Sequence, residues 1–167
     1  MKMDSKIFQR MILEENINLT SKDTNYNIND IITKKLAKKV EGKCIKEGYI
    51  KKDSIEIVNR SLGVLINSNF DSTVNYVVKY SADVCMLSNN QIIECEIFSI
   101  DKSQIICYVG EKSNSPVEIY LFKHHHVGNV DFINLRKEDT IKVKIIGTKY
   151  EFKDTQIIAI AEFLEKK

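Results

Sequence analysis

The chain is poor in the residues from which many catalytic and nucleotide-binding sites are built. Its 167 residues include one proline, no tryptophan and six glycines. Such scattered glycines do not form a Gly-rich phosphate cradle, and Walker, GxGxxG, GxSxG and HExxH patterns are all missing. No two acidic residues have a spacing that indicates general acid–base catalysis. We therefore expect a protein that is not an enzyme and that uses no cofactor.

Cysteines at metal-ligand spacing are also lacking. The four cysteines, Cys44, Cys85, Cys95 and Cys107, are spread along the chain without a close pair. In a reducing compartment such cysteines behave as small buried apolar groups. This structural role is favoured over a metal or redox role.

Long apolar runs and a strong charge of one sign are absent. No run approaches the roughly 18 apolar residues of a membrane span, and the first residues, with early acidic groups, are not expected to form a signal peptide. An intracellular protein without a membrane partner is expected. The net charge of +2 does not by itself require a nucleic-acid partner. Arginine is rare, whereas lysine, isoleucine and asparagine are abundant, a bias typical of AT-rich genomes such as those of some large DNA viruses and microbes.

One amphipathic helix is predicted from residue 28 onward. Asn27 is a suitable N-cap, and Gly42 lies where a helix commonly stops. Lysines fill the second half of the helix, where they suit its dipole and indicate a solvated face more than a nucleic-acid stripe. The apolar stripe that defines the helix consists of Ile28, Ile31, Ile32, Leu36 and Val40.

The rest of the chain has the pattern of β-strands. Apolar residues alternate in "STVNYVVKYSADV", residues 72–84, and a polar stretch at 87–90 then marks a boundary. Five further strands are expected at residues 92–100, 104–110, 117–123, 140–150 and 156–164. Their number and spacing indicate a small OB-type barrel. The predicted fold is α+β, with an N-terminal antiparallel sheet and one helix (1–88) followed by a five-stranded OB/S1-like barrel (89–167).

The barrel carries the residues that suggest a ligand. S1-type OB folds present side chains to single-stranded RNA, and bases stack on aromatic rings. Three adjacent histidines end the third barrel strand; on an extended segment His124 and His126 would share a face, but they lack a further metal donor. The aromatic residues nearby are Phe98, Tyr108, Tyr120 and Phe122, and the candidate phosphate neighbours are Lys123, Lys142 and Lys144.

Several ordered motifs together resemble the RNA polymerase stalk subunits, a family that comprises the seventh subunit of eukaryotic RNA polymerase II and its archaeal counterpart. The helix followed by "VEGKCIKEGYI" (40–50) is similar to the family pattern V-E-G-x-C with G-Y-I after it. "VVKYSADV" (77–84) and "VEIYLFKH" (117–124) resemble two family strands, and "IKVKIIG" and "IIAIAEF" resemble the last two. Almost the whole chain is covered in order.

The resemblance implies a non-catalytic subunit of a multi-subunit DNA-directed RNA polymerase. Its N-terminal "tip" would dock on core subunits, namely the largest subunit, the clamp base and a small omega-like subunit. Its barrel would contact nascent single-stranded RNA, and a fourth-subunit-like partner is left open. The implied docking residues are Gly42, Cys44, Gly48, Tyr49 and Ile50, with the "GYI" segment exposed. The implied RNA-binding residues are Tyr108, Tyr120, Lys123, His124, Lys142 and Lys144.

A free-standing S1/OB RNA-binding protein is the alternative. It would need a stronger basic and aromatic face and RNA affinity in isolation. An enzyme with a metal site at the histidines ranks third. The expected location is the nucleus for a cellular protein, and a cytoplasmic viral factory or the virion for a large DNA virus.

Overall fold

The computed structural model describes residues 7–23, 27–68 and 71–167. These form two compact units. One unit, here called the helical unit, consists of Arg10–Gly42 and Ile50–Val84. The other, the barrel unit, combines residues 7–9 with Lys43–Tyr49 and Cys85–Lys167. The predicted boundary between residues 88 and 89 stays a prediction about domains.

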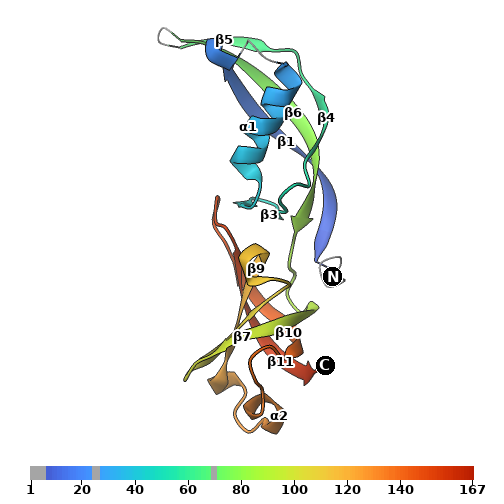
Figure 1. Cartoon of the computed structure of the whole chain (residues 1–167), viewed down its shortest axis with the longest axis vertical. Coiled ribbons are helices and arrows are strands. Elements are labelled where there is room, and N and C mark those ends of the chain that lie inside the picture. The colour runs from blue at the N-terminus through green and yellow to red at the C-terminus, as the bar shows by residue number, and fades with distance from the viewer. Residues whose placement is uncertain (1–6, 24–26, 69–70) are drawn as a thin grey trace. The chain divides into compact units, whose positions relative to one another are not determined.

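Strands dominate both units (Figure 1). In chain order the elements are β1 (Phe8–Thr20), η2 (Ser21–Asp23), α1 (Ile28–Val40), β2 (Cys44–Ile45), β3 (Gly48–Ile50), β4 (Glu56–Arg60), β5 (Val64–Ser68), β6 (Asp71–Cys85), β7 (Ile92–Ile100), β8 (Gln104–Tyr108), η3 (Lys112–Asn114), β9 (Val117–Phe122), η4 (Lys123–His125), α2 (Val130–Ile133), β10 (Thr140–Lys149) and β11 (Ile157–Lys166).

Helix α1 confirms the predicted helix and both of its ends. The Asn27 side chain accepts a hydrogen bond from the Asn29 backbone N–H at 3.0 Å, which satisfies one free donor at the N-terminus. Gly42 adopts a left-handed φ of 66° just after the helix, a conformation that glycine takes at little cost. The buried members of the apolar stripe are Ile32, Leu36 and Val40.

Helix α1 lies along β1 (Figure 1), and two of its lysines donate hydrogen bonds to backbone carbonyls of β1. Lys39 Nζ lies 2.8 Å from a carboxylate oxygen of Glu15 on β1. Lys35 Nζ lies 2.6 Å from Asp23 and also donates to the Asn18 carbonyl. The hydrogen bond from Lys35 and another from Thr20 lower the pKa of Asp23 to about 2. These lysines therefore have partners within the chain.

Strand β6 is the long strand to which β4 and β5 both pair antiparallel. Its predicted alternation is confirmed, because Tyr76, Val78, Tyr80, Ala82 and Val84 are all buried. The sheet runs in the order β1-β6-β3-β2, with β4 and β5 also on β6. Sequence reasoning missed β5 as a separate strand.

The five predicted barrel strands form a closed barrel in the order β10-β11-β9-β8-β7, with β7 paired to β10. The third and fifth of these strands, β9 and β11, are parallel, whereas the other pairs are antiparallel. A five-stranded barrel of this kind fits the OB fold. The predicted α+β class, a sheet with one helix and an OB barrel, is confirmed.

All four cysteines are buried, as expected for structural groups. Burial raises the pKa of the Cys44 thiol to about 11 and that of Cys85 to about 12. A hydrogen bond to Cys107, together with burial, also raises the pKa of Cys95. The thiols of Cys44, Cys85 and Cys95 therefore stay protonated at neutral pH and are poor nucleophiles.

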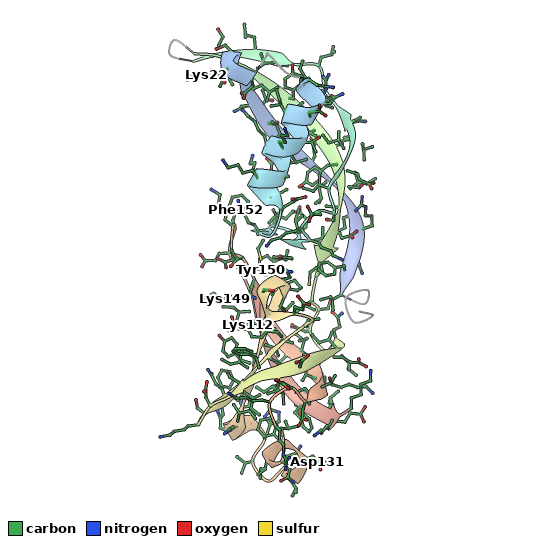
Figure 2. All side chains as sticks on the ribbon, viewed as in Figure 1. Lys22, Lys112, Asp131, Lys149, Tyr150 and Phe152 are labelled. Atoms are coloured by element: carbon green, nitrogen blue, oxygen red, sulfur yellow. The ribbon has the colours of Figure 1, made fainter. Side chains whose placement is uncertain are left out.

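The short hairpin β2–β3, apart from its last residue Ile50, belongs to the barrel unit. Cys44 pairs with Tyr49, and its backbone exchanges hydrogen bonds with the β10–β11 loop, with Asp154 at 2.6 Å and with Lys153 at 2.9 Å. Tyr150, labelled in Figure 2, donates from its hydroxyl to the Lys46 carbonyl at 3.1 Å. The hairpin is thus fastened to one end of the barrel.

The structure corrects the expectation that "GYI" is exposed. Tyr49 is only 5% exposed and Ile50 is fully buried, because both side chains already pack within the chain. Gly42, Gly48 and Cys44 are buried too.

None of the helices among the described residues is both long and apolar enough to cross a membrane.

Candidate nucleic-acid interface on the barrel

Strand β9 presents the centre of the candidate surface. Its residues alternate between the barrel core and the outer face: Val117, Ile119 and Leu121 are buried, and Glu118, Tyr120 and Phe122 are half-exposed. The antiparallel register sets Tyr108 of β8 beside Glu118 and Ile106 beside Tyr120. The outer side of β8 and β9 is therefore rich in aromatic and apolar groups.

A single carboxylate organises two of the predicted RNA-binding tyrosines. The hydroxyl groups of Tyr108 and Tyr120 both donate to Glu118 Oε1, at 3.2 and 3.0 Å. Burial, followed by the nearby Glu118 charge, raises the pKa of Tyr108 to about 12 and also raises that of Tyr120. Both phenols are neutral donors at physiological pH, and their rings are held in fixed positions.

Phe98 of β7 adds an exposed ring beside Tyr108. The β7–β8 register shifts between Ile97 and Ser99, so Phe98 is the extra residue of a bulge. Its ring is 44% exposed and meets Tyr108 edge to face, with centroids 5.5 Å apart. Lys112, labelled in Figure 2, places its Nζ 3.7 Å from the Phe98 ring centroid. The result is an aromatic surface with a cation over it.

The histidine segment differs from its prediction. Lys123–His125 forms a 3₁₀ turn instead of continuing the strand, so His124 and His126 do not share a face. His124 and His125 are exposed and contact each other, with ring centroids 4.1 Å apart, while His126 is buried. The turn forms because the Lys123 carbonyl accepts the His126 backbone N–H at 3.0 Å.

His126 is a structural group inside the barrel unit. Its Nδ1 lies 2.8 Å from the Phe122 carbonyl oxygen, and its Nε2 accepts the Phe163 backbone N–H. Its ring also stacks on Phe132 of α2, with centroids 4.2 Å apart. Among the described residues no group of three or more His, Cys, Asp or Glu side chains is arranged to hold a metal ion.

Strand β11 separates β10 from β9, but β10 pairs with β7 on its other side. There the two predicted lysines of β10, Lys142 and Lys144, lie opposite Glu94 and Ile92 and not opposite Phe98. Lys142 forms an ion pair with Glu165, and this hydrogen bond raises the pKa of the Lys142 ammonium. Lys144 sits opposite Glu162 in the strand register. Neighbouring carboxylates thus reduce the positive potential that a phosphate would meet at these two lysines.

The structure brings some of the predicted RNA-binding residues together and leaves others apart. Tyr108 and Tyr120 share Glu118, and Lys123 and His124 lie in the turn that ends β9. Sequence reasoning missed Lys112, Lys137 and Glu138, which come from loops and approach β7 only in the folded barrel. No periodic pattern in the sequence marks them. The RNA-binding role of all these residues stays a prediction.

The comparisons with known proteins identify the family resemblance. A putative DNA-directed RNA polymerase subunit of Acanthamoeba polyphaga mimivirus is 28% identical over 166 residues, covering 92% of this chain and 80% of the relative. The RNA polymerase II subunit RPB7 of Glycine max is 24% identical, covering 87% of this chain and 86% of the relative. Subunit 7 of Arabidopsis thaliana RNA polymerase II matches to the same extent.

No protein-family model matches the chain. The three relatives nevertheless cover both the sheet with its helix and the barrel. RPB7-type subunits are non-catalytic, which agrees with the missing catalytic patterns. The predicted resemblance to the stalk-subunit family is confirmed, and the chain is an RPB7-like RNA polymerase subunit.

Proposed function

We propose that this RPB7-like chain is the stalk subunit of a multi-subunit DNA-directed RNA polymerase. In this proposal its N-terminal part docks on the core enzyme, and its barrel contacts nascent RNA. The observation that carries the proposal is the length of the match: relatives named as polymerase subunits align with 87–92% of the chain. A protein that shared only an OB barrel with them would match over about half of that length.

Exposed apolar side chains in the helical unit support docking on a protein. Leu62 is 87% exposed and Val64 is 62% exposed, and Val58, Leu65 and Ile66 on β4 and β5 are also exposed. These residues lie close together in the sequence, and exposed apolar patches mark protein interaction sites. We assign this apolar edge, residues Val58, Leu62, Val64, Leu65 and Ile66, to contact with the large polymerase subunits and the omega-like subunit.

The predicted docking residues can act on this contact only indirectly. Gly42, Cys44, Gly48, Tyr49 and Ile50 are buried, so their role would be to shape the β2–β3 hairpin and present its exposed turn residue Lys46. A Tyr49→Asp substitution would place a charge in the core and unfold the protein. It is therefore unsuitable as a test of docking.

Affinity purification from native extract tests the docking proposal. Tagged wild-type protein should bring down the two largest polymerase subunits. The double variant Leu62→Asp, Val64→Asp should lose them, while Ile133→Asp, an equally exposed apolar site on the barrel, should keep them. If the double variant still brought down the polymerase subunits, the assignment of the apolar edge to docking would be wrong. If the wild type brought down no polymerase, the proposal of a stalk subunit would be wrong.

The aromatic surface of the barrel supports the RNA contact. Phe98, Tyr120 and Phe122 offer partly exposed rings on which bases can stack, and Lys112 and Lys123 are adjacent cations. Tyr108, predicted as a further RNA contact, is only 8% exposed and instead packs against Phe98. Photo-crosslinking of transcribing polymerase with labelled RNA should give crosslinks on β7–β9. Crosslinks confined to other subunits would reject this part of the proposal.

The same surface keeps a free-standing S1/OB RNA-binding protein as the second candidate. Its mark would be RNA binding by the isolated protein without co-purification of polymerase. Location follows from the assignment: the nucleus for a cellular polymerase, and a viral factory or virion for a viral one. A fourth-subunit-like partner would appear in the same affinity purification.

A further inference from the structure

We infer that a pocket beside β7 binds the guanine base of a nucleotide, an inference that rests on the proposed contact with RNA. The pocket has a volume of about 370 Å³ and lies wholly within the barrel unit. It is lined by Glu96, Ile97, Phe98, Ser99, Tyr108, Gly110, Lys112, Lys137 and Glu138. Two aromatic rings, two carboxylates and two ammonium groups thus surround one space.

The aromatic rings provide a stacking wall. Tyr108 meets Phe98 edge to face, and Glu118 fixes the Tyr108 hydroxyl from the other side. The flexible side chain of Lys112 lies over the face of Phe98, with its Nζ 3.7 Å from the ring centroid. A base that stacks on Phe98 displaces this ammonium group toward its own phosphate. Base–aromatic stacking contributes about 1–3 kcal/mol per base.

The segment that carries Glu138 is fixed against β7. The Glu138 backbone N–H donates to the Ile97 carbonyl at 2.8 Å, and the Ile97 N–H donates to the Asp139 carbonyl at 3.0 Å. Asp139 is anchored in turn by Lys166, 2.8 Å away. Glu138 itself has a left-handed φ of 68°. Its position beside the pocket is therefore set by the backbone.

The carboxylates indicate which base the pocket prefers. Within the described part of the chain neither Glu96 nor Glu138 has an ion pair or a side-chain hydrogen bond, although Lys112 and Lys137 line the same pocket. An ionised carboxylate only accepts hydrogen bonds. The Watson–Crick edge of guanine offers two adjacent donors, N1–H and the N2 amino group, and so matches the two oxygens of one carboxylate.

The other bases fit such a carboxylate less well. Adenine and cytosine each place a ring-nitrogen acceptor next to their amino donor, which brings a lone pair against a carboxylate oxygen. Uracil has one N–H donor between two carbonyl acceptors. Each mismatch leaves one charged acceptor without its partner, and a good bidentate pair discriminates by about 1–3 kcal/mol. Guanine is the base that pairs without repulsion.

Titration of the full-length protein with nucleotides tests the inference. GMP, AMP, CMP and UMP are added separately, and backbone amide shifts are followed by NMR. GMP should shift residues 96–98, 112 and 137–138, with affinity about tenfold higher than that of UMP. Equal binding of the four nucleotides, or shifts centred on the β10 lysines, would overturn the guanine assignment.

RNA and free nucleotide are distinguished by a second arm. The pentamers UUUUU and UUGUU are compared by fluorescence anisotropy, and the guanine-containing strand should bind about tenfold more tightly. A preference for free GMP without any preference for UUGUU would assign the pocket to a mononucleotide and overturn the RNA-linked form. Equal binding of both pentamers, together with equal binding of GMP and UMP, would overturn the guanine inference while leaving the proposed RNA contact intact.

Two variants and a control distinguish the carboxylates, which should select guanine, from Phe98, on which any base should stack. Glu138→Gln and Glu96→Gln together should abolish the guanine preference without weakening UUUUU, whereas Phe98→Ala should weaken both strands. Glu94→Gln is the matched control, because Glu94 lies on the same strand but pairs with Lys167 at 2.9 Å. A guanine preference that survives in the double variant would reject the carboxylates as its source. Absence of binding to either pentamer, together with normal polymerase co-purification, would reject both the RNA contact and this inference.

Discussion

The imidazole of His126 accepts the backbone N–H of Phe163 at its Nε2 atom, 2.8 Å away. Because Nε2 accepts, the proton of the neutral ring lies on Nδ1, which faces the Phe122 carbonyl at 2.8 Å. One side chain therefore joins the end of β9 to β11, two strands that are distant in sequence and parallel in the barrel.

Replacing His126 should weaken the fold of the barrel. His126→Ala removes two hydrogen bonds and the stacking on Phe132, and it leaves the Phe163 N–H without an acceptor. The free energy of unfolding should fall by about 2–4 kcal/mol. Urea unfolding followed by circular dichroism measures this. His125→Ala, at an exposed neighbour, should change it by less than about 0.5 kcal/mol, and equal effects of both changes would contradict the assignment.

Tyr108 should make the protein less stable at high pH. Its pKa rises from 10.0 to about 12 in the folded state, first because of burial and then because of Glu118. The neutral phenol is thus favoured by folding. Its contribution is complete below pH 10.0 and is lost as the pH rises toward 12. Across this pH range the melting temperature of the wild type should fall more steeply than that of Tyr108→Phe. Parallel curves of melting temperature against pH would contradict the raised pKa of Tyr108.

Lys123 should contribute more to RNA binding than Lys142. The Lys123 ammonium has no ion-pair partner among the described residues, whereas Lys142 pairs with Glu165. Lys123→Gln should weaken binding of a uridine strand and reduce the slope of log affinity against log salt by about 0.7. Lys142→Gln should change the slope less.

A charge-releasing variant provides the control for this comparison. Glu165→Gln frees the Lys142 ammonium, so affinity should rise if β10 lies near the RNA path. An unchanged affinity would place β10 outside the path. If Lys142→Gln reduced RNA affinity more than Lys123→Gln, the prediction that Lys123 contributes more to RNA binding would be wrong.

Gly63 should not tolerate a side chain. A Cβ atom there would lie 2.5 Å from Val74 Cγ1 and 2.8 Å from Cζ of the Tyr76 ring. Gly63→Ala therefore requires both side chains to move, and we expect a loss of about 1–3 kcal/mol in the free energy of unfolding. Gly147→Ala is the matched control, because the described residues place no atom within 4 Å of its Cβ. Similar losses for the two variants in denaturant unfolding would show that the crowding is not the cause.

The sequence pattern was sufficient for the elements with a strong period. α1 follows from a stripe of spaced isoleucines, leucine and valine, and β6 and the barrel strands follow from alternation. The short strands β2 and β3 were not predicted because two or three residues are too few to show a period. Strand β5 was missed because it begins with three consecutive apolar residues, Val64, Leu65 and Ile66, and so does not alternate. The turn at Lys123–His125 was missed for a related reason: its backbone is set by a local hydrogen bond that composition does not encode.

The candidate site was predicted only where it lies on regular strands. Tyr108 and Tyr120 were found because β8 and β9 alternate. Their shared contact with Glu118 depends on register, which one sequence does not specify. Lys112 and Glu138 reach β7 from loops, and the ion pair of Lys142 with Glu165 required knowing that β10 and β11 are neighbours.

The hairpin β2–β3 has a consequence for how this barrel is inherited. The buried core cluster of the barrel includes Ile7, Cys44, Tyr49 and Cys85, and all four residues precede the first barrel strand in the sequence. The coding sequence for residues 89–167 would therefore specify all five strands but only part of their interior. A gene fusion that carried only residues 89–167 would leave out these four residues, so its product should expose the apolar surface that they cover and tend to aggregate.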